Sequence, residues 1–252
     1  MLPDGLPVLT YHSLDESGSV ISMRPALFRE QMLALAERGY RAITVTELLD
    51  IWDGGGALPT RTVVLTFDDA VENLATHALP LLGDLGFRAT IYVVSARLGE
   101  YNDWPEPARG IPRLPLLSRE ALLDMLASGF EVGAHTRRHL RLPRLASAQL
   151  FDEVVSCKHE LEDQLGIAVS SFAYPYGAVS PEARKLASAH YRSAVGTSLG
   201  LTTPQHDRFD LPRVEMYYFR QPAAFKLLGT FAGRLYLSAR AAGRGLRAAT
   251  VR

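Results

Sequence analysis

Two short polar clusters in the sequence have the residue types of a hydrolytic metal site. Asp68 and Asp69 directly follow an apolar run that ends at Phe67. Two adjacent carboxylates at the end of a buried strand are costly unless a positive charge lies beside them. His135 and His139 also follow an apolar run. At this i, i+4 spacing we expect both imidazoles to lie on one face of a helical turn and to point at one ion.

Two imidazoles and one carboxylate, with positions left for water, form a hydrolytic site for zinc or a similar divalent cation. Each cluster alone has an ordinary explanation, because an Asp-Asp pair is commonly a turn or helix cap and a His-x-x-x-His pair commonly lies on a surface. Their shared position directly after a strand favours the metal site. The carboxyl ends of the strands form the catalytic face of α/β barrels, so we expect the two clusters to meet there.

The elements that position these clusters alternate between short apolar runs and longer segments of helical period. We expect strands at residues 7–12, 42–45, 62–67, 89–94, 130–134, 171–174 and 191–196, and near 209–217. We expect helices at residues 25–39, 71–85, 119–128, 147–165 and 181–190. This alternation predicts parallel strands with helical crossovers. Since the sequence has no internal repeat and no linker, we expect a single α/β domain.

Composition and charge limit the classes of function. The 252 residues are 47% apolar, which is enough for one substantial core. Lys and Arg total 27, as do Asp and Glu, so the net charge gives no reason to expect nucleic-acid binding. Cys157 is the only cysteine, which excludes an intrachain disulfide and a thiolate cluster. The first residues do not resemble a secretory signal, and no run reaches the roughly 18 apolar residues of a membrane span, so we expect a cytoplasmic protein.

The segment from Thr66 to Asp69, together with His135, Thr136 and His139, resembles the polysaccharide deacetylases, the NodB-homology group of carbohydrate esterase family 4. The resemblance extends from about residue 7 to residue 222 and includes the segments 7–13, 172–177 and 211–214. The Tyr-His-Ser and Tyr-Pro-Tyr-Gly sequences in these segments are similar to the branch that includes poly-N-acetylglucosamine deacetylases. The resemblance implies a distorted (β/α)7-type barrel, and we expect it to occupy residues 1–222. We expect residues 223–252 to form a basic C-terminal helix or tail.

The activity that the resemblance implies is removal of N-acetyl groups from the amino sugars of a polysaccharide or glycan precursor, with release of acetate. The implied metal ligands are Asp69, His135 and His139, and we expect the cofactor to be a divalent metal, Zn²⁺. Asp68 is the implied general base, and the backbone N–H of Tyr176 is an implied donor to the oxyanion. The alternatives are an O-acetyl ester or non-sugar C–N hydrolase and a non-catalytic glycan-binding protein.

The sequence departs from the family pattern at two catalytic positions. The late Leu-x-His motif that usually supplies the general acid is absent. We expect His12, at the end of the first strand, to be the acid, and the alternative is a packed structural histidine. The arginine that usually precedes the Pro-Tyr turn is replaced by Ala173. We expect Arg213 to orient Asp68, and the alternative is an ion pair with a surface carboxylate such as Asp210.

Two further positions leave alternatives open. The glycine that usually follows the two aspartates is Ala70. A positive φ there would cost alanine about 1 kcal/mol, whereas the start of a helix would cost nothing. Trp104 lies in a proline-rich loop from residue 99 to residue 115, and we expect it either to stack on a sugar ring or to be pinned under the loop.

The C-terminal segment is basic. After Pro222 the chain has six basic residues and no acidic residue. Apolar residues recur at helical spacing there: Phe225, Leu228, Phe231 and Leu235. The pattern predicts a closing helix with a basic end. The alternative is a surface that contacts anionic lipid or a lipid-linked substrate, which would place the protein at a membrane surface.

Overall fold

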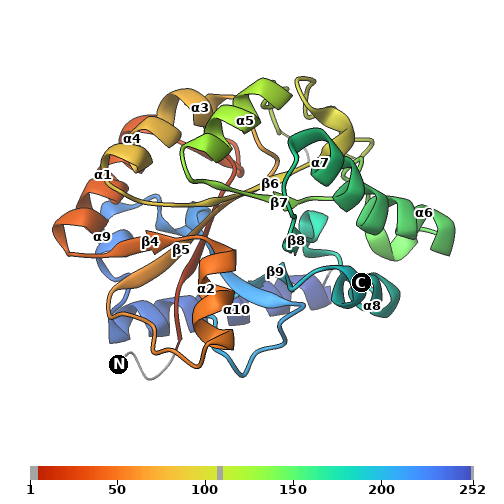
Figure 1. The fold of residues 1–252 in the computed structure, drawn as a ribbon. Helices are drawn as coiled ribbons and strands as arrows, with labels where there is room; N and C mark the ends of the chain where they lie inside the picture. The colour runs from red at the N-terminus through yellow and green to blue at the C-terminus, as the bar shows by residue number, and fades with distance from the viewer. Residues whose placement is uncertain (1–4, 107–109, 251–252) are drawn as a thin grey trace.

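The computed structural model describes the backbone of residues 5–106 and 110–250, and the side chains of these residues up to residue 244. Its central element is a closed ring of seven parallel strands with helices around the outside (Figure 1). The ring order is β1 (Val8–Tyr11), β10 (Leu211–Glu215), β9 (Ser193–Leu199), β8 (Ser171–Ala173), β7 (Glu131–Ala134), β6 (Thr90–Val93) and β5 (Thr62–Phe67), which pairs back with β1. This arrangement confirms the expected distorted (β/α)7-type barrel.

An eighth parallel strand, β4 (Arg41–Ile43), lies outside the ring. It pairs with the first half of β5, from Thr62 to Val64, whereas β6 pairs with β5 only at Thr66 and Phe67. One edge of β5 is therefore shared between two neighbours, which distorts the barrel. Because the ring strands are parallel, their carboxyl ends open at a single rim. The two clusters that follow β5 and β7 are thereby placed at the same end of the barrel.

The helices lie between the strands in chain order, and a short strand pair, β2 (Ser13–Leu14) and β3 (Ser22–Met23), follows β1. The first helices are α1 (Pro25–Glu37), α2 (Val45–Asp53), α3 (Asn73–His77), α4 (Leu79–Asp84) and α5 (Arg119–Ala127). The later ones are α6 (Ser147–Phe151), a π-helical segment (Asp152–Ser156), α7 (Cys157–Leu165), α8 (Pro181–His190), α9 (Pro222–Lys226) and α10 (Phe231–Thr250).

Two helical regions differ from the sequence-based expectation. The apolar pattern does not predict α2, although its capping box is a readable signal. The Thr44 hydroxyl accepts the Glu47 N–H, and the Glu47 carboxylate accepts the Thr44 N–H at 2.7 Å. The helix expected at 71–85 is broken at Ala78 into α3 and α4. Pro80, in the first turn of α4, has no N–H to continue the preceding helix.

Aromatic packing fixes the ends of the strands that lead into the site. The Phe28 ring of α1 lies 5.1 Å from the Tyr11 ring and 5.9 Å from the Phe67 ring, measured between centroids. The Tyr11 hydroxyl donates to Gln31 Oε1 at 2.9 Å. These contacts belong to the main core between the ring and its helices. They hold the last residues of β1 and β5, directly before His12 and Asp68.

The C-terminal segment packs on the barrel and also exposes apolar side chains. Phe225, Leu228 and Leu237 are buried in the main core. On α10, Phe231 is 69% exposed and Leu235 is 58% exposed. None of the described helices is long and apolar enough to cross a membrane. The domain boundary at residue 222, the cytoplasmic location and the contact of the basic segment with lipid stay predictions.

Candidate active site

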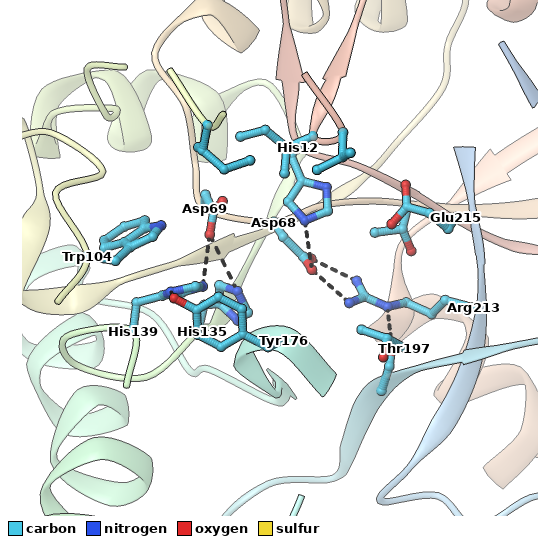
Figure 2. Close-up of a pocket in the computed structure, with 15 residues that line it drawn as sticks. His12, Asp68, Asp69, Trp104, His135, His139, Tyr176, Thr197, Arg213 and Glu215 are labelled. Atoms are coloured by element: carbon cyan, nitrogen blue, oxygen red, sulfur yellow. Dashed lines mark hydrogen bonds and ion pairs between the residues drawn. The ribbon is translucent and has the colours of Figure 1, made fainter. Parts of the chain in front are cut away.

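Asp69, His135 and His139 lie together at the carboxyl end of the barrel (Figure 2). All three are buried, and one ligand-type atom from each lies within 4.8 Å of the other two. Asp69 Oδ1 is 3.5 Å from His135 Nε2 and 3.3 Å from His139 Nε2. This carboxylate oxygen is buried with no hydrogen-bond partner among the described residues. Two imidazole nitrogens and one orphaned carboxylate oxygen that converge in this way fit a divalent cation.

The other nitrogen of each imidazole is engaged, which orients the ring. His135 Nδ1 donates to the carbonyl oxygen of Ala173 at 2.8 Å. His139 Nδ1 lies 3.1 Å from the Tyr176 hydroxyl, which itself donates to the carbonyl oxygen of Glu106. Burial lowers the pKa of His135 to about 4, so this imidazole is neutral at neutral pH. The Nε2 atoms of both rings are therefore directed toward Asp69.

The segment that joins the two histidines is a loop, so the expected helical turn is wrong. Thr136 has a φ of 65° and His139 has a φ of 62°. Both values lie in the left-handed region, which a right-handed α-helix does not contain. The His139 N–H donates to Thr136 Oγ1 at 2.9 Å, which closes the turn. The imidazoles face Asp69 because the backbone reverses locally, and not because of helical periodicity.

Asp68 and Arg213 form a buried bidentate ion pair. Arg213 Nη1 and Nη2 each lie 2.7 Å from one oxygen of the Asp68 carboxylate. Arg213 Nε donates to the carbonyl oxygen of Gly196 at 2.8 Å, so the guanidinium is held on both sides. Burial alone would raise the pKa of Asp68, but the charge and hydrogen bonds of Arg213 hold that pKa well below its usual range. Of the two carboxylates considered for Arg213, the described contacts pair it with Asp68.

His12 lies on the other side of the Asp68 carboxylate (Figure 2). Its Nε2 atom is 3.9 Å from Asp68 Oδ2. Its Nδ1 atom is buried and has no hydrogen-bond partner among the described residues. Ring closure positions this histidine, because β1 pairs with β5 on one edge and with β10 on the other. His12 thus lies in the site, and its role as the acid stays a prediction.

Several residues around the site other than glycine have left-handed backbone. Asp69 has a φ of 69° and Ala70 a φ of 54°, so of the two alternatives for Ala70 the structure has the strained one. Tyr176 has a φ of 59° and precedes Gly177, whose φ is 63°. A Cβ atom on Gly177 would lie 1.9 Å from Thr197 Oγ1, so only glycine fits there. The role of the Tyr176 N–H as an oxyanion donor stays a prediction.

Trp104 is buried beneath its loop and also borders the Asp69–His135–His139 cluster. Its side chain is 6% exposed, and its ring stacks on the His139 ring with centroids 4.4 Å apart. Ion pairs also hold the same loop, because the Glu106 carboxylate pairs with Arg141 and Arg144. The expectation of a pinned tryptophan is therefore met, and its indole still contributes one wall of the site.

A cavity of about 220 Å³ opens over these residues. Several residues of its lining were not expected from the sequence, among them Val20, Ile21, Thr197 and Glu215. Val20 and Ile21 lie in the turn between β2 and β3, where no motif marks them. Glu215 is the last residue of β10. A carboxylate at the carboxyl end of a barrel strand is a signal that could have identified it.

Comparisons with known proteins agree with this fold. The family model described as polysaccharide deacetylase matches residues 55–194, more than half of the chain. YxkH of Bacillus subtilis, whose name places it among the polysaccharide deacetylases, is 26% identical over 215 residues, which cover 85% of this chain and 72% of YxkH.

One further relative is named for a specific polymer, and another similar protein has a solved structure. A poly-β-1,6-N-acetyl-D-glucosamine N-deacetylase of Staphylococcus aureus is 22% identical over 203 residues, covering 77% of this chain and 67% of that protein. The structure of IcaB from Ammonifex degensii matches with a TM-score of 0.76 and 25% identity, covering 91% of this chain and 97% of that one. The chain belongs to the polysaccharide deacetylase family, and its activity class is that of a carbohydrate deacetylase.

Proposed function

We propose that this protein removes N-acetyl groups from amino sugars of a polysaccharide or glycan precursor, using a divalent metal held by Asp69, His135 and His139. One observation carries the proposal. The orphaned oxygen of Asp69 and two imidazole nitrogens converge directly beside a second carboxylate, Asp68, that an arginine holds in place. A glycan-binding protein without catalysis would have little need of both a metal site and an oriented base.

The donor set favours Zn²⁺ as the metal. Two imidazoles and one carboxylate are the ligand types of hydrolytic zinc sites, in which further positions stay open. When bound, such a cation polarises the acyl oxygen and lowers the pKa of water in the site. All other catalytic contributions come from the side chains and backbone of the chain.

Asp68 is positioned to take the proton from the attacking water. Since Arg213 keeps the pKa of Asp68 low, this carboxylate is ionised and able to accept a proton at neutral pH. His12 lies beside the same carboxylate and would donate a proton to the leaving amine. The backbone N–H of Tyr176 would donate to the oxyanion, and a donor of this kind is worth on the order of 3 kcal/mol.

The amino-sugar substrate is proposed from the named relatives and from the cavity. The Staphylococcus aureus relative is named for poly-β-1,6-N-acetyl-D-glucosamine. The cavity beside the metal ligands has an indole wall from Trp104 and apolar side chains from Val20 and Ile21. Such surfaces pack against the apolar faces of sugar rings. No described residue favours the alternative of an O-acetyl ester or a non-sugar C–N bond.

Acetate release from matched substrates tests the proposal. The purified protein, loaded with Zn²⁺, is incubated with N-acetylglucosamine oligomers and, separately, with acetylated xylan. We expect acetate from the oligomers, loss of that activity after chelation, and its return when Zn²⁺ is added. Release from acetylated xylan alone would replace the amide hydrolase with an ester hydrolase. Undiminished activity after complete removal of metal would refute the metal-dependent mechanism.

A further inference from the structure

Glu153 is a charged side chain with no exposed surface, and no catalytic step proposed above uses it. Its exposed fraction is 0%. It lies in the π-helical segment that separates α6 from α7. Short π segments inside α-helices occur frequently at functional sites. A buried carboxylate is costly unless its oxygens accept hydrogen bonds, so the donors that Glu153 meets indicate what it does.

The donors that Glu153 meets all belong to the loop between the two histidine ligands. Glu153 Oε2 accepts the backbone N–H of Arg137 at 3.1 Å and that of Arg138 at 2.8 Å. Glu153 Oε1 accepts Arg138 Nε at 2.8 Å. Arg137 and Arg138 are two of the three residues between His135 and His139. A single carboxylate therefore fixes the middle of the loop from below.

Backbone groups of β6 and of the residues that follow it also form hydrogen bonds with this loop. The His135 N–H donates to the carbonyl oxygen of Val93 at 2.8 Å, which continues the β6–β7 pairing. The carbonyl oxygens of Thr136 and Arg137 accept the N–H groups of Ser95 and Ala96 at 3.2 and 3.0 Å. These neighbours are backbone groups that cannot be removed by substitution. Glu153 is the side chain from outside the loop that accepts the backbone N–H groups of residues 137 and 138.

The loop needs such support because its backbone is strained. Thr136 and His139 both have positive φ, a conformation that residues other than glycine keep only when the surroundings enforce it. A loop that relaxed would rotate the His139 imidazole away from Asp69, since His139 itself is one of the strained residues. The spacing of the two Nε2 atoms therefore depends on the hydrogen bonds that hold residues 137 and 138.

We propose that Glu153 is a positioning residue for the metal ligands, which holds the 135–139 loop in the shape that brings both imidazoles onto one cation. Outer residues that orient metal ligands typically change metal affinity by about 10–100-fold when they are replaced. The inference rests on the proposed function, because it requires that Asp69, His135 and His139 bind a metal.

Glu160 provides a matched control on the same helical stretch. It accepts Arg137 Nε at 2.6 Å and the Ser95 hydroxyl at 2.6 Å. It thus belongs to the same network of charges as Glu153. The described contacts of Glu160 involve side chains only, and no backbone N–H of the 135–139 loop. Glu160→Gln should therefore weaken the network and leave the loop backbone in place.

The test compares Glu153→Gln with Glu160→Gln. Glutamine keeps the size of the side chain, but its NH2 group faces at least one of the three donors that Glu153 accepts. Zn²⁺ affinity is measured by competition with a chromophoric chelator, and the melting temperature is measured on the metal-free proteins. We expect the Zn²⁺ dissociation constant to rise about 10–100-fold in Glu153→Gln. We expect no change in Glu160→Gln, and a high Zn²⁺ concentration should restore kcat in Glu153→Gln with KM unchanged.

An unchanged Zn²⁺ dissociation constant in Glu153→Gln would overturn the inference. If Glu153→Gln fails to fold, Glu153→Asp takes its place, since it keeps the charge but withdraws the carboxylate from the loop by one methylene. We expect the same rise in the dissociation constant there. Failure of the proposed function gives a different result, because the wild-type protein itself would then bind no Zn²⁺. If the wild-type protein and both Glu153 variants bind Zn²⁺ equally well, the positioning role of Glu153 is refuted and the proposed metal site is not.

Discussion

The loop from His135 to His139 and the Asp68–Arg213 pair border one cavity but are held in place in different ways. The loop from His135 to His139 contains left-handed residues and a hydrogen bond between two of its own residues, and Glu153, from the π-helical segment that follows in the chain, accepts two of its backbone N–H groups. The Asp68–Arg213 pair joins residues that are 145 positions apart, and it forms only when β10 reaches β1 and β1 reaches β5. The shape of the 135–139 loop therefore depends on its own strained backbone and on a carboxylate nearby in the chain, whereas the Asp68–Arg213 pair depends on closure of the barrel.

The largest expected loss of activity comes from removing a proposed metal ligand in the 135–139 loop. His135→Ala should lose the metal and reduce acetate release by about a thousandfold or more, because the cation supplies several kcal/mol of transition-state stabilisation. Metal content by mass spectrometry and acetate release are measured on the same sample. His159→Ala, at an exposed histidine, is the control. A His135→Ala protein that binds no metal and still turns over would refute the mechanism.

The second-largest expected effect comes from replacing His12, the proposed general acid. His12→Gln should retain the metal and lose about a hundredfold in kcat on N-acetylated oligomers, the scale of one general acid. The loss should be much smaller on 4-nitrophenyl acetate, whose leaving group needs no proton. Both rates and the metal content are compared with those of the wild type. Equal losses on both substrates would contradict the role of His12 as the acid.

Arg213→Lys should have a smaller effect on rate and a clear effect on pH dependence. Lysine keeps the charge but cannot make both hydrogen bonds to Asp68, so we expect about a tenfold loss in kcat from misplacement of the carboxylate. Arg213 holds the pKa of Asp68 below its usual range, so weakening the pair raises that pKa toward and above the usual value. Asp68 then becomes protonated at a higher pH.

The acidic limb of the profile of kcat/KM against pH should therefore move to higher pH in Arg213→Lys. The measurement is a full pH profile with metal content checked at each end. An acidic limb at the wild-type position, together with a reduced rate, would show that Arg213 acts on something other than Asp68.

The smallest expected effect is at Ala70, next to the proposed metal ligand Asp69. Glycine relieves the positive φ, worth about 1 kcal/mol, but it loses a buried methyl group and loosens the unfolded chain by similar amounts. Ala70→Gly should change the free energy of unfolding by less than about 1 kcal/mol and leave kcat unchanged. Urea unfolding measures the first quantity. A loss of several kcal/mol would mean that the Ala70 methyl group, rather than the backbone conformation, determines stability there.

The sequence predicts the strands and the grouping of the site residues, but not the conformation of the loop. Periodicity and alternation predict the ring strands because each is a short apolar run with a parallel partner. Asp69, His135 and His139 could be placed together because each follows a strand. The loop conformation could not be predicted, since the left-handed residues Thr136 and His139 have no glycine to mark them.

Other features of the site depended on contacts that only the folded chain makes. Val20 lines the cavity from a turn without a motif, and Trp104 is buried by its own loop. Glu153 appears in the sequence as one more charge of an amphipathic helix. Its burial depends on the π-helical segment, which no residue pattern here announces. Sequence periodicity therefore does not reveal the contacts made when the barrel closes, nor the left-handed and π-helical segments.

We infer that the two adjacent carboxylates have different roles: Asp69 binds the metal, and Asp68 accepts the proton of the attacking water. The most direct measurement is metal content and acetate release in Asp68→Asn and Asp69→Asn, prepared in parallel. We expect Asp68→Asn to keep its metal while kcat falls by about a thousandfold, and Asp69→Asn to lose both. Loss of the metal from Asp68→Asn, or near wild-type turnover by that variant, would contradict the account.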